Sequence, residues 1–390
     1  MTRVLLWLLG RMPIGWLQLV SNKLRFAAAG TGVAFACILV FVQLGMLGAF
    51  REATRISYRT LNADIMISAS DANGLSEGSN VARRRLFQAL AVPGTKEAMP
   101  VFVGKTSWLQ EDGTKIQLTA IGIDPTRQSF IGPTVTDAET LRLSNNAMLD
   151  RLSRGLKPQQ LDEVSPDNPM VIEINGEQIS ITGTVSVGGG FTADGYMVVS
   201  DQTFLRLFPA RSSGAPNHIL LNIETGEDPD KVSERIRGSL ASESIIVRSF
   251  TKAIEDENTY QTTRRPTGLI FGVGVVIGTL VGLVIVYQIL STDVADHLSE
   301  YATFKAMGFS QRFFRSIVLE EAVILAFVGF IPALLATIGI YSIMAKATAL
   351  PIAMSPERAV MVLVGTVLSC TLSGFLAMRK LANADPADLF

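Results

Sequence analysis

Residues 74–78 (Gly-Leu-Ser-Glu-Gly) have the Gly-x-Ser-x-Gly spacing of a nucleophile elbow, a strained turn that exposes a serine for acyl transfer. One of the two histidines, His218, follows Ser76 in the chain order of α/β-hydrolases. An elbow joins its strand directly to its helix, whereas Asp-Ala-Asn at 71–73 separates the preceding strand pattern from this motif. We therefore interpret the match as accidental and expect no catalytic residue. A membrane-anchored hydrolase using Ser76 is the weakest of three functional readings.

Two other groups of residues could bind a ligand. Gly104-Lys105-Thr106 resembles the end of a phosphate-binding P-loop, but Met99 stands where that loop needs a glycine, and the segment reads as a strand. Both cysteines, Cys37 and Cys370, lie in apolar stretches, which excludes a disulfide or thiolate metal site from the polar part of the chain. The sequence thus predicts no ATP site, no cofactor and no metal, and any ATP hydrolysis is expected in a separate partner chain.

The composition indicates whether the chain is soluble or membrane-bound. Of 390 residues, 48% are hydrophobic and 18% are charged, against about 25% charged in soluble domains. The deficit comes from four uncharged stretches, at 26–50, 266–292, 322–345 and 359–378. Each can cross a hydrocarbon core about 30 Å thick as a helix. We therefore predict an α-helical membrane protein with four transmembrane helices and a large α+β extracytoplasmic domain inserted between helices 1 and 2.

The predicted organisation follows these stretches. The segments are an interfacial amphipathic helix at 1–25, membrane helix 1 at 26–50, the α+β domain with a helical stalk at both ends at 51–265, membrane helix 2 at 266–292, a cytoplasmic coupling helix at 293–312, membrane helix 3 at 313–345, a short periplasmic loop at 346–358, membrane helix 4 at 359–378 and a cytoplasmic tail at 379–390. Residues 1–25 are equally consistent with an ordinary signal-anchor flank.

Basic residues beside the membrane stretches predict the orientation, because short positive flanks stay in the cytoplasm. The N-terminal flank carries Arg3, Arg11, Lys23 and Arg25 and no acid, and Arg379 and Lys380 follow the last stretch. Both termini are therefore expected in the cytoplasm and the large domain in the periplasm. A net charge of −1 gives no support for nucleic-acid binding.

The polar part of the chain mixes strand and helix patterns. Asn175-Gly176 between two apolar runs is a strong hairpin signal, and Glu111-Asp112-Gly113 is another. We expect strands at 64–70, 101–110, 115–123, 170–174, 178–187, 196–200, 218–223 and 245–250, and helices at 81–90, 201–207 and 228–240. Ser79 or Asn80 is the expected cap of the first helix. The pattern predicts an α+β domain in two lobes.

Glycines recur in the second membrane stretch at a spacing that lets helix backbones approach closely. They are Gly268, Gly272, Gly274, Gly278 and Gly282. We predict a helix-packing or dimer face here, the alternative being that glycine is simply common in membrane helices. The four apolar stretches contain no charge, which argues against a proton relay or ion site within them.

The segment after the second stretch is the most informative. It ends in Glu300-Tyr301-Ala302-Thr303-Phe304-Lys305-Ala306-Met307-Gly308, which resembles the cytoplasmic helix of the FtsX/MacB superfamily of ABC permeases. The order of one helix, a large domain and three helices is similar too, and so is the tail at 385–390. A closer resemblance is to DevC-type permeases of glycolipid exporters. It rests on segments 16–19, 63–65, 83–90, 150–154, 200–206 and 286–308, and it is weakest around 74–80.

This resemblance implies a homodimeric permease in the inner membrane, without catalytic residues or cofactor. The implied partners are two copies of an ABC ATPase subunit, a periplasmic adaptor (membrane fusion) protein, an outer-membrane channel of TolC type and membrane lipid. The implied function is export of a lipid or other amphipathic cargo by mechanotransmission. The alternative is an FtsX-like signalling subunit that controls a periplasmic hydrolase.

The residues of this segment support a coupling role independently of the resemblance. A short helix with a charged side and an apolar side can seat in a groove of a partner protein, or else rest on lipid. The residues expected to contact the ATPase are Asp296, Glu300, Tyr301, Phe304, Lys305, Met307 and Gly308. Gly308 is expected to be the left-handed residue that ends the helix.

Overall fold

The computed structural model describes residues 13–190, 193–297, 303–304 and 307–382. Of the predicted segments, residues 1–12 and 383–390 lie outside this range, as do Glu300, Tyr301 and Lys305 of the predicted coupling helix. The chain forms two compact units. The helical unit comprises Met1–Leu47, Leu269–Ile343 and Ile352–Phe390, and the sheet unit comprises Gly48–Gly268 and Met344–Pro351.

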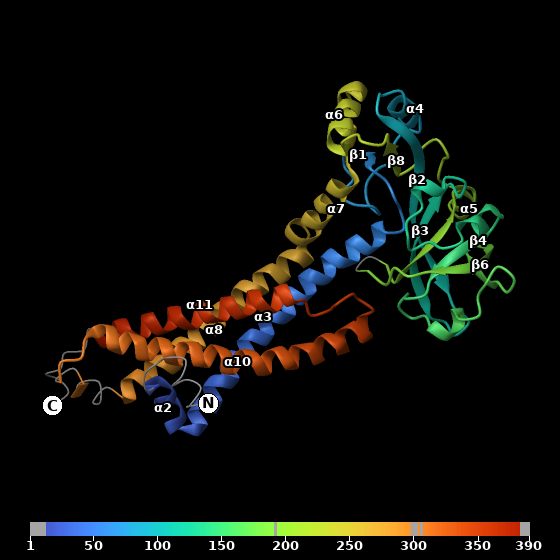
Figure 1. The fold of residues 1–390 in the computed structure, drawn as a ribbon. Coiled ribbons are helices and arrows are strands. Elements are labelled where there is room, and N and C mark those ends of the chain that lie inside the picture. Colours follow the sequence, from blue (N-terminus) through green and yellow to red (C-terminus); the bar gives the residue numbers. More distant parts are fainter. Residues whose placement is uncertain (1–12, 191–192, 298–302, 305–306, 383–390) are drawn as a thin grey trace. The chain divides into compact units, whose positions relative to one another are not determined.

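The helical unit contains four helices that are long and apolar enough to cross a membrane (Figure 1). They are α3 (Lys23–Tyr58), α8 (Pro266–Asp296), α10 (Gln311–Thr348) and α11 (Pro356–Ala382), preceded by the short α2 (Ile14–Ser21). The predicted fold class is thus confirmed. A single residue, Asn22, separates α2 from α3 in extended backbone. Large apolar side chains remain exposed along α8 and α11, as expected of helices that face hydrocarbon.

The membrane helices extend beyond the uncharged stretches, and the additions are polar. Helix α10 begins at Gln311 and therefore includes Glu320 and Glu321, which are 8% and 0% exposed. Helix α8 likewise includes Asp293, which is buried, and Arg25 Nη1 of α3 lies 3.8 Å from Asp293 Oδ1. Glu320 accepts a hydrogen bond from the backbone N–H of Trp16. A search limited to uncharged stretches therefore missed these buried acids.

The sheet unit is built on nine strands in the order β5-β6-β4-β7-β3-β2-β8-β1-β9. Their bounds are β1 Ile65–Ala69, β2 Thr95–Leu109, β3 Lys115–Ile123, β4 Asn146–Asp150, β5 Met170–Ile174, β6 Glu177–Val185, β7 Gly195–Ser200, β8 His218–Ile223 and β9 Ile245–Ser249. Neighbours are antiparallel except for the β3–β7 and β4–β6 pairs, which are parallel.

The long strand β2 divides the sheet into two lobes. Its first half pairs with β8 and its second half with β3. Helices α4 (Arg84–Leu90) and α6 (Pro229–Leu240) cover the β1–β8–β9 lobe and share a core with it. Helix α5 (Asp201–Leu207) packs on the other lobe through Phe204 and Leu207. Three short 3₁₀ turns complete the unit, at Gln128–Phe130, Ala138–Arg142 and Pro158–Leu161.

Local chemistry explains the ends of several elements. Asn175 and Gly176 both have positive φ, of 54° and 82°, which a two-residue hairpin turn of type I′ requires. The Ser200 side chain caps α5 by accepting the Thr203 N–H, and the Asp228 side chain caps α6.

Three expectations for this unit were wrong: strand β2 begins at Thr95 rather than at 101, and helix α4 differs both in its start and in its cap. Helix α4 begins at Arg84 rather than at 81, and its N-cap is Arg83 without a side-chain hydrogen bond, so neither Ser79 nor Asn80 is the cap. Ser79 instead donates its hydroxyl to Asp71. Strand β4 was not predicted at all.

Candidate functional site

Helix α3 leads into the sheet unit, and a second helix leads out of it. Helix α3 continues unbroken to Tyr58, which is 1% exposed and belongs to the core of the sheet unit. On the return path, α7 (Phe250–Thr259) follows β9 directly, and a π-helical turn at Tyr260–Arg264 leads to α8. Helices therefore stand at both ends of the sheet unit, with a π-turn at the end of the second, and their role as a stalk stays a prediction.

Glu257 of α7 ties both stalk helices to the loop after β1. Its Oε2 atom accepts hydrogen bonds from the Tyr58 hydroxyl and from the Leu75 N–H, both at 2.8 Å. A side chain at Gly74 would collide with the Glu257 carboxyl, so the loop approaches this closely because residue 74 is glycine. Burial raises the pKa of Glu257, and the two hydrogen bonds oppose that shift.

His218 of β8 binds the same residue, Leu75, at its carbonyl group. Its Nε2 lies 2.9 Å from the Leu75 carbonyl oxygen, and its Nδ1 lies 2.9 Å from Ser68 Oγ. A carbonyl only accepts, so we assign the proton to Nε2, and Nδ1 accepts from the serine. Burial lowers the pKa of His218 to about 4, which keeps the ring neutral.

These contacts bear on whether Ser76 of the Gly-x-Ser-x-Gly motif could act as a nucleophile. Both ring nitrogens of His218 are engaged with Ser68 and Leu75, so neither is available to Ser76 as a general base. The motif residues form a loop with a bridge between Gly74 and Glu77. The second near-match, at 104–106, lies inside strand β2 and pairs with β3, away from any strand-to-helix turn.

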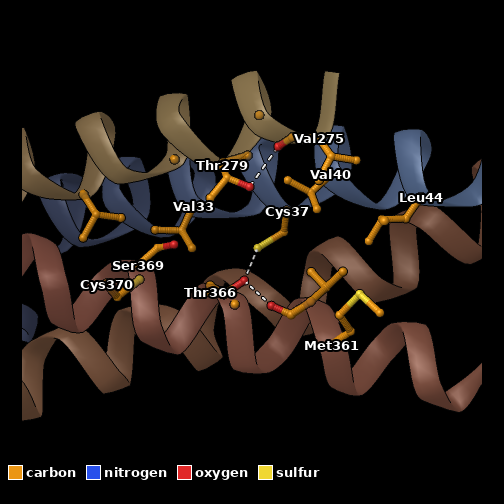
Figure 2. A pocket seen from close by; sticks show the side chains of 16 residues that line it. Val33, Cys37, Val40, Leu44, Val275, Thr279, Met361, Thr366, Ser369 and Cys370 are labelled. Atoms are coloured by element: carbon orange, nitrogen blue, oxygen red, sulfur yellow. Dashed lines mark hydrogen bonds between the residues drawn. The ribbon is translucent and has the colours of Figure 1, made fainter. Parts of the chain in front are cut away.

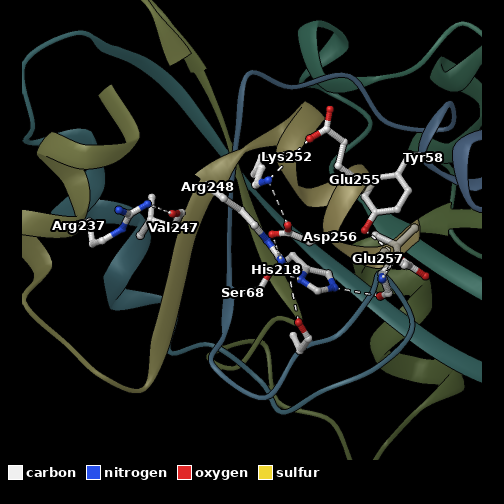
Figure 3. A network of polar contacts seen from close by, with 12 residues as sticks. Tyr58, Ser68, His218, Arg237, Val247, Arg248, Lys252, Glu255, Asp256 and Glu257 are labelled. Atoms are coloured by element: carbon white, nitrogen blue, oxygen red, sulfur yellow. Dashed lines mark hydrogen bonds and ion pairs between the residues drawn. The ribbon is translucent and has the colours of Figure 1, made fainter. Parts of the chain in front are cut away.

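Two arginines add further bonds to this loop, and Figure 3 shows the first of them, Arg248. Arg248 of β9 donates to the Ala72 carbonyl at 3.3 Å and pairs with Asp256 of α7 at 2.9 Å. Arg265, just after the π-turn, pairs with Glu77. We call the set Tyr58, Ser68, Leu75, His218, Arg248 and Glu257 the stalk junction. It links α3, α7 and the β1–β8–β9 lobe by directional bonds.

The glycine series of α8 lies partly against α3. Side chains at Gly278 and Gly282 would come within 3.1 Å of Val40 and 3.0 Å of Ala36, and one at Gly274 would meet Gln43. Gly272 has open space instead, and Gly268 lies against the backbone carbonyls of the π-turn. The series is a packing face within the helical unit at three of its five positions. Its use between two copies of the chain stays a prediction.

A cavity of about 190 Å³ lies beside this face, between α3, α8 and α11 (Figure 2). Both cysteines line it, and Cys37 Sγ lies 3.2 Å from Thr366 Oγ1. The hydroxyls of Thr366 and Thr279 donate to carbonyls one turn earlier in their own helices. The lining therefore presents mainly apolar atoms and no charged group.

The predicted coupling segment is described only in part. Asp296 is the last residue of α8 and pairs with Arg25. Phe304 contacts Phe309 and Phe313, with ring centroids 5.6 and 6.1 Å apart, so it packs inward, whereas Met307 is 59% exposed. These two residues therefore differ in exposure, and the apolar side of this segment stays a prediction. Gly308 has a φ of +91°, as expected for the left-handed end of this segment. Contact with an ATPase stays a prediction.

Comparisons with known proteins locate the resemblance. Residues 272–386 match the family described as FtsX-like permease C-terminal, which confirms the FtsX/MacB resemblance over α8, α10 and α11. The DevC-type resemblance stays a prediction. A search of curated proteins found no match.

Two solved structures are similar to part of this chain. The extracellular domain of the noncanonic ABC-type transporter YknZ from Gram-positive bacteria is 13% identical, with a TM-score of 0.32 over 47% of this chain and 98% of its own. The periplasmic region of MacB from Actinobacillus actinomycetemcomitans is 11% identical, with a TM-score of 0.35 over 54% of this chain and 99% of its own.

Proposed function

We propose that this multi-pass membrane protein is the permease subunit of an ABC exporter, because residues 272–386 match the family described as FtsX-like permease C-terminal. In this proposal a separate ATPase chain supplies the energy, and a periplasmic adaptor and an outer-membrane channel complete the route. The cargo is a lipid or another amphipathic molecule. The protein acts as a homodimer in the inner membrane, with its sheet unit in the periplasm.

The continuity of α3 supports this proposal most directly. One unbroken helix contains a membrane-spanning segment and ends at Tyr58, in the core of the sheet unit. A continuous helix can carry displacement along its axis because its backbone hydrogen bonds resist extension and bending. Movement of α3 would therefore reach the sheet unit without a ligand passing through the membrane helices.

The stalk junction is where movement of α3 would reach the sheet unit. Glu257 accepts from Tyr58 and from Leu75, so it bonds to the last residue of α3 and to the loop after β1 at once. A shift of α3 relative to α7 would lengthen one of these bonds. Two discrete arrangements of this junction, biased by ATP at one end and by adaptor or cargo at the other, would meet the physical requirement for coupling between distant sites.

Co-purification tests the proposal. The chain alone should show no ATP hydrolysis, and it should change the turnover of an ATPase subunit that co-purifies with it. Insertion of two glycines after Thr54 in the stalk part of α3 should preserve ATPase binding but abolish that change, because the insertion breaks the helix. The same insertion after Gly113 is the control, since this hairpin turn has open space around it. Robust hydrolysis by the chain alone, or an unaffected stalk variant, would refute the proposal.

A further inference from the structure

The loop after β4 places an arginine at the end of the third long helix. Arg154 Nε donates to the carbonyl oxygen of Thr348 at 2.9 Å, and Thr348 is the last residue of α10. The last four carbonyls of an α-helix have no partner within the helix, and a cation there also complements the helix dipole. Both residues belong to the sheet unit. The contact therefore joins the end of α10 to this unit.

The guanidinium of Arg154 is held in place by other groups. Its Nη1 lies 3.3 Å from Asp194 Oδ1, and its Nη2 donates to the Gly190 carbonyl at 3.4 Å. The backbone N–H of Arg154 donates to the Asp194 carbonyl at 2.8 Å. The second carboxylate oxygen of Asp194 accepts the Gln117 N–H of β3 at 2.9 Å. The arginine is thus oriented by groups fixed to the sheet.

A buried carboxylate organises the two loops that meet here. Asp150, at the end of β4, is 0% exposed and accepts the N–H groups of Leu152, Val187 and Gly188 at 3.1, 3.0 and 2.7 Å. Burial raises the pKa of Asp150, and these hydrogen bonds act against that shift. Asp150 therefore fixes both the turn that carries Arg154 and the start of the glycine loop at 188–190.

The end of α10 and the glycine loop lie close together. Gly188 has a φ of +92°, and a Cβ atom on Gly189 would lie 3.7 Å from the Ala349 carbonyl oxygen. Ala349 itself has a φ of +52°, a left-handed conformation that alanine rarely adopts. The chain accepts this strain at the residue after Thr348, which is where Arg154 binds.

The exposure of the Arg154 side chain indicates that it orients the groups around it rather than adding much to stability. Its side chain is 41% exposed, and ion pairs at such positions add little to stability. Three separate acceptors nevertheless converge on it, on Asp194, Gly190 and Thr348. A planar guanidinium can serve several acceptors in fixed directions, which a lysine cannot.

We propose that Arg154 is a positioning residue that clamps the end of α10 to the β4–β6 part of the sheet and transmits movement of the third membrane helix to it. The clamp is a connection separate from the stalk junction, which involves α3 and α7. The transmitting role rests on the proposed function, whereas the clamp itself does not.

Hydrogen exchange of the full-length chain in lipid nanodiscs tests the clamp without any partner. Arg154→Ala and Arg154→Lys should each raise the exchange rate of 344–351 and 186–190 several-fold, with α7 unchanged. Arg151→Ala is the matched control, because Arg151 lies three residues earlier and pairs only at the surface, with Asp162. Unchanged exchange in both Arg154 variants would overturn the clamp.

A second arm tests transmission, using the ATPase subunit that co-purifies with the chain. Both Arg154 variants should bind this ATPase normally but cause a several-fold smaller change in its ATP turnover than wild-type chain does, and Arg151→Ala should match wild type. Faster exchange with wild-type coupling would show a merely structural contact and overturn the transmitting role. If wild-type chain engages no ATPase, the proposed function fails, while the exchange experiment still decides the clamp.

Discussion

The stalk junction and the glycine face of α8 hold helices together by different means. At the stalk junction, Glu257 and His218 bind the backbone N–H and C=O of one residue, Leu75, through hydrogen bonds of 2.8 and 2.9 Å. On the glycine face, Gly278 and Gly282 pack against α3 through shape alone. Directional bonds to buried groups fail when one atom is removed, whereas a packed face fails when volume is added. This difference predicts that the two regions respond differently to substitutions.

The largest effect is expected from removing the shared acceptor of the stalk junction. Glu257→Leu leaves the Tyr58 hydroxyl and the Leu75 N–H without their partner, so unfolding free energy of the sheet unit should fall by about 3 kcal/mol. Chemical denaturation of the full chain, followed by exchange of strands β1 and β8, measures it.

The control is Glu255→Leu on the same helix, where the side chain is 71% exposed and pairs only with Lys252. It should change stability by less than about 1 kcal/mol. Equal losses of unfolding free energy for the two variants would mean that Glu257 stabilises the sheet unit no more than an exposed carboxylate on the same helix does.

The next largest effect is a pH dependence of stability that arises from the stalk junction and not from the glycine face of α8. His218 has its pKa lowered to about 4 from 6.5, so the unfolded chain binds the proton first. The stabilisation is therefore complete above about pH 6.5 and is lost as pH falls towards 4, by about 3 kcal/mol in total. Glu257, with its raised pKa, acts in the opposite direction. Thermal unfolding of wild type and His218→Gln between pH 4 and 7 isolates the histidine, and parallel curves would contradict its role.

Adding volume to the glycine face should cost less. Gly282→Leu places a side chain where its Cβ would lie 3.0 Å from Ala36 Cβ, which forces α3 and α8 apart. A loss of about 1–3 kcal/mol is expected from such overpacking. Gly272→Leu on the same helix meets open space and should be neutral or stabilising. Thermal denaturation in detergent compares them, and the packing interpretation fails if Gly272→Leu is the more damaging.

The smallest effect should come from Tyr58→Phe. This change removes one hydrogen bond to Glu257 but leaves the Leu75 N–H in place. A loss of about 1 kcal/mol is expected, together with faster exchange at the end of α3. A loss as large as that of Glu257→Leu would show that Tyr58 contributes through packing rather than through its hydroxyl.

Local patterns predicted elements well where the residue types favour one structure. Strand β8 and helix α5 have the predicted bounds, and Asn175-Gly176 forms the predicted turn. Strand β4 was missed because its sequence, Asn-Ala-Met-Leu-Asp, contains no β-branched or aromatic residue, although it pairs with β6 and β7.

The sites were less accessible to sequence analysis. Glu257 follows Glu255 and Asp256 and resembles an ordinary exposed stalk acid, yet its partner Leu75 is 182 residues away. Arg154 and Thr348 are 194 residues apart. No periodicity reports such pairs. The available signal was the close-approach glycine at position 74, which sequence analysis treated as part of an accidental motif.

The proposed function requires that nucleotide-driven movement reaches the sheet unit through the stalk part of α3 and the stalk junction. Hydrogen exchange of the complex with the co-purified ATPase tests it most directly, with and without ATP and vanadate. We predict that nucleotide changes the exchange of residues 71–78 at the stalk junction, and that two glycines inserted after Thr54 abolish the change while ATPase binding persists. Identical exchange of 71–78 in both nucleotide states, with nucleotide demonstrably bound, would contradict the account.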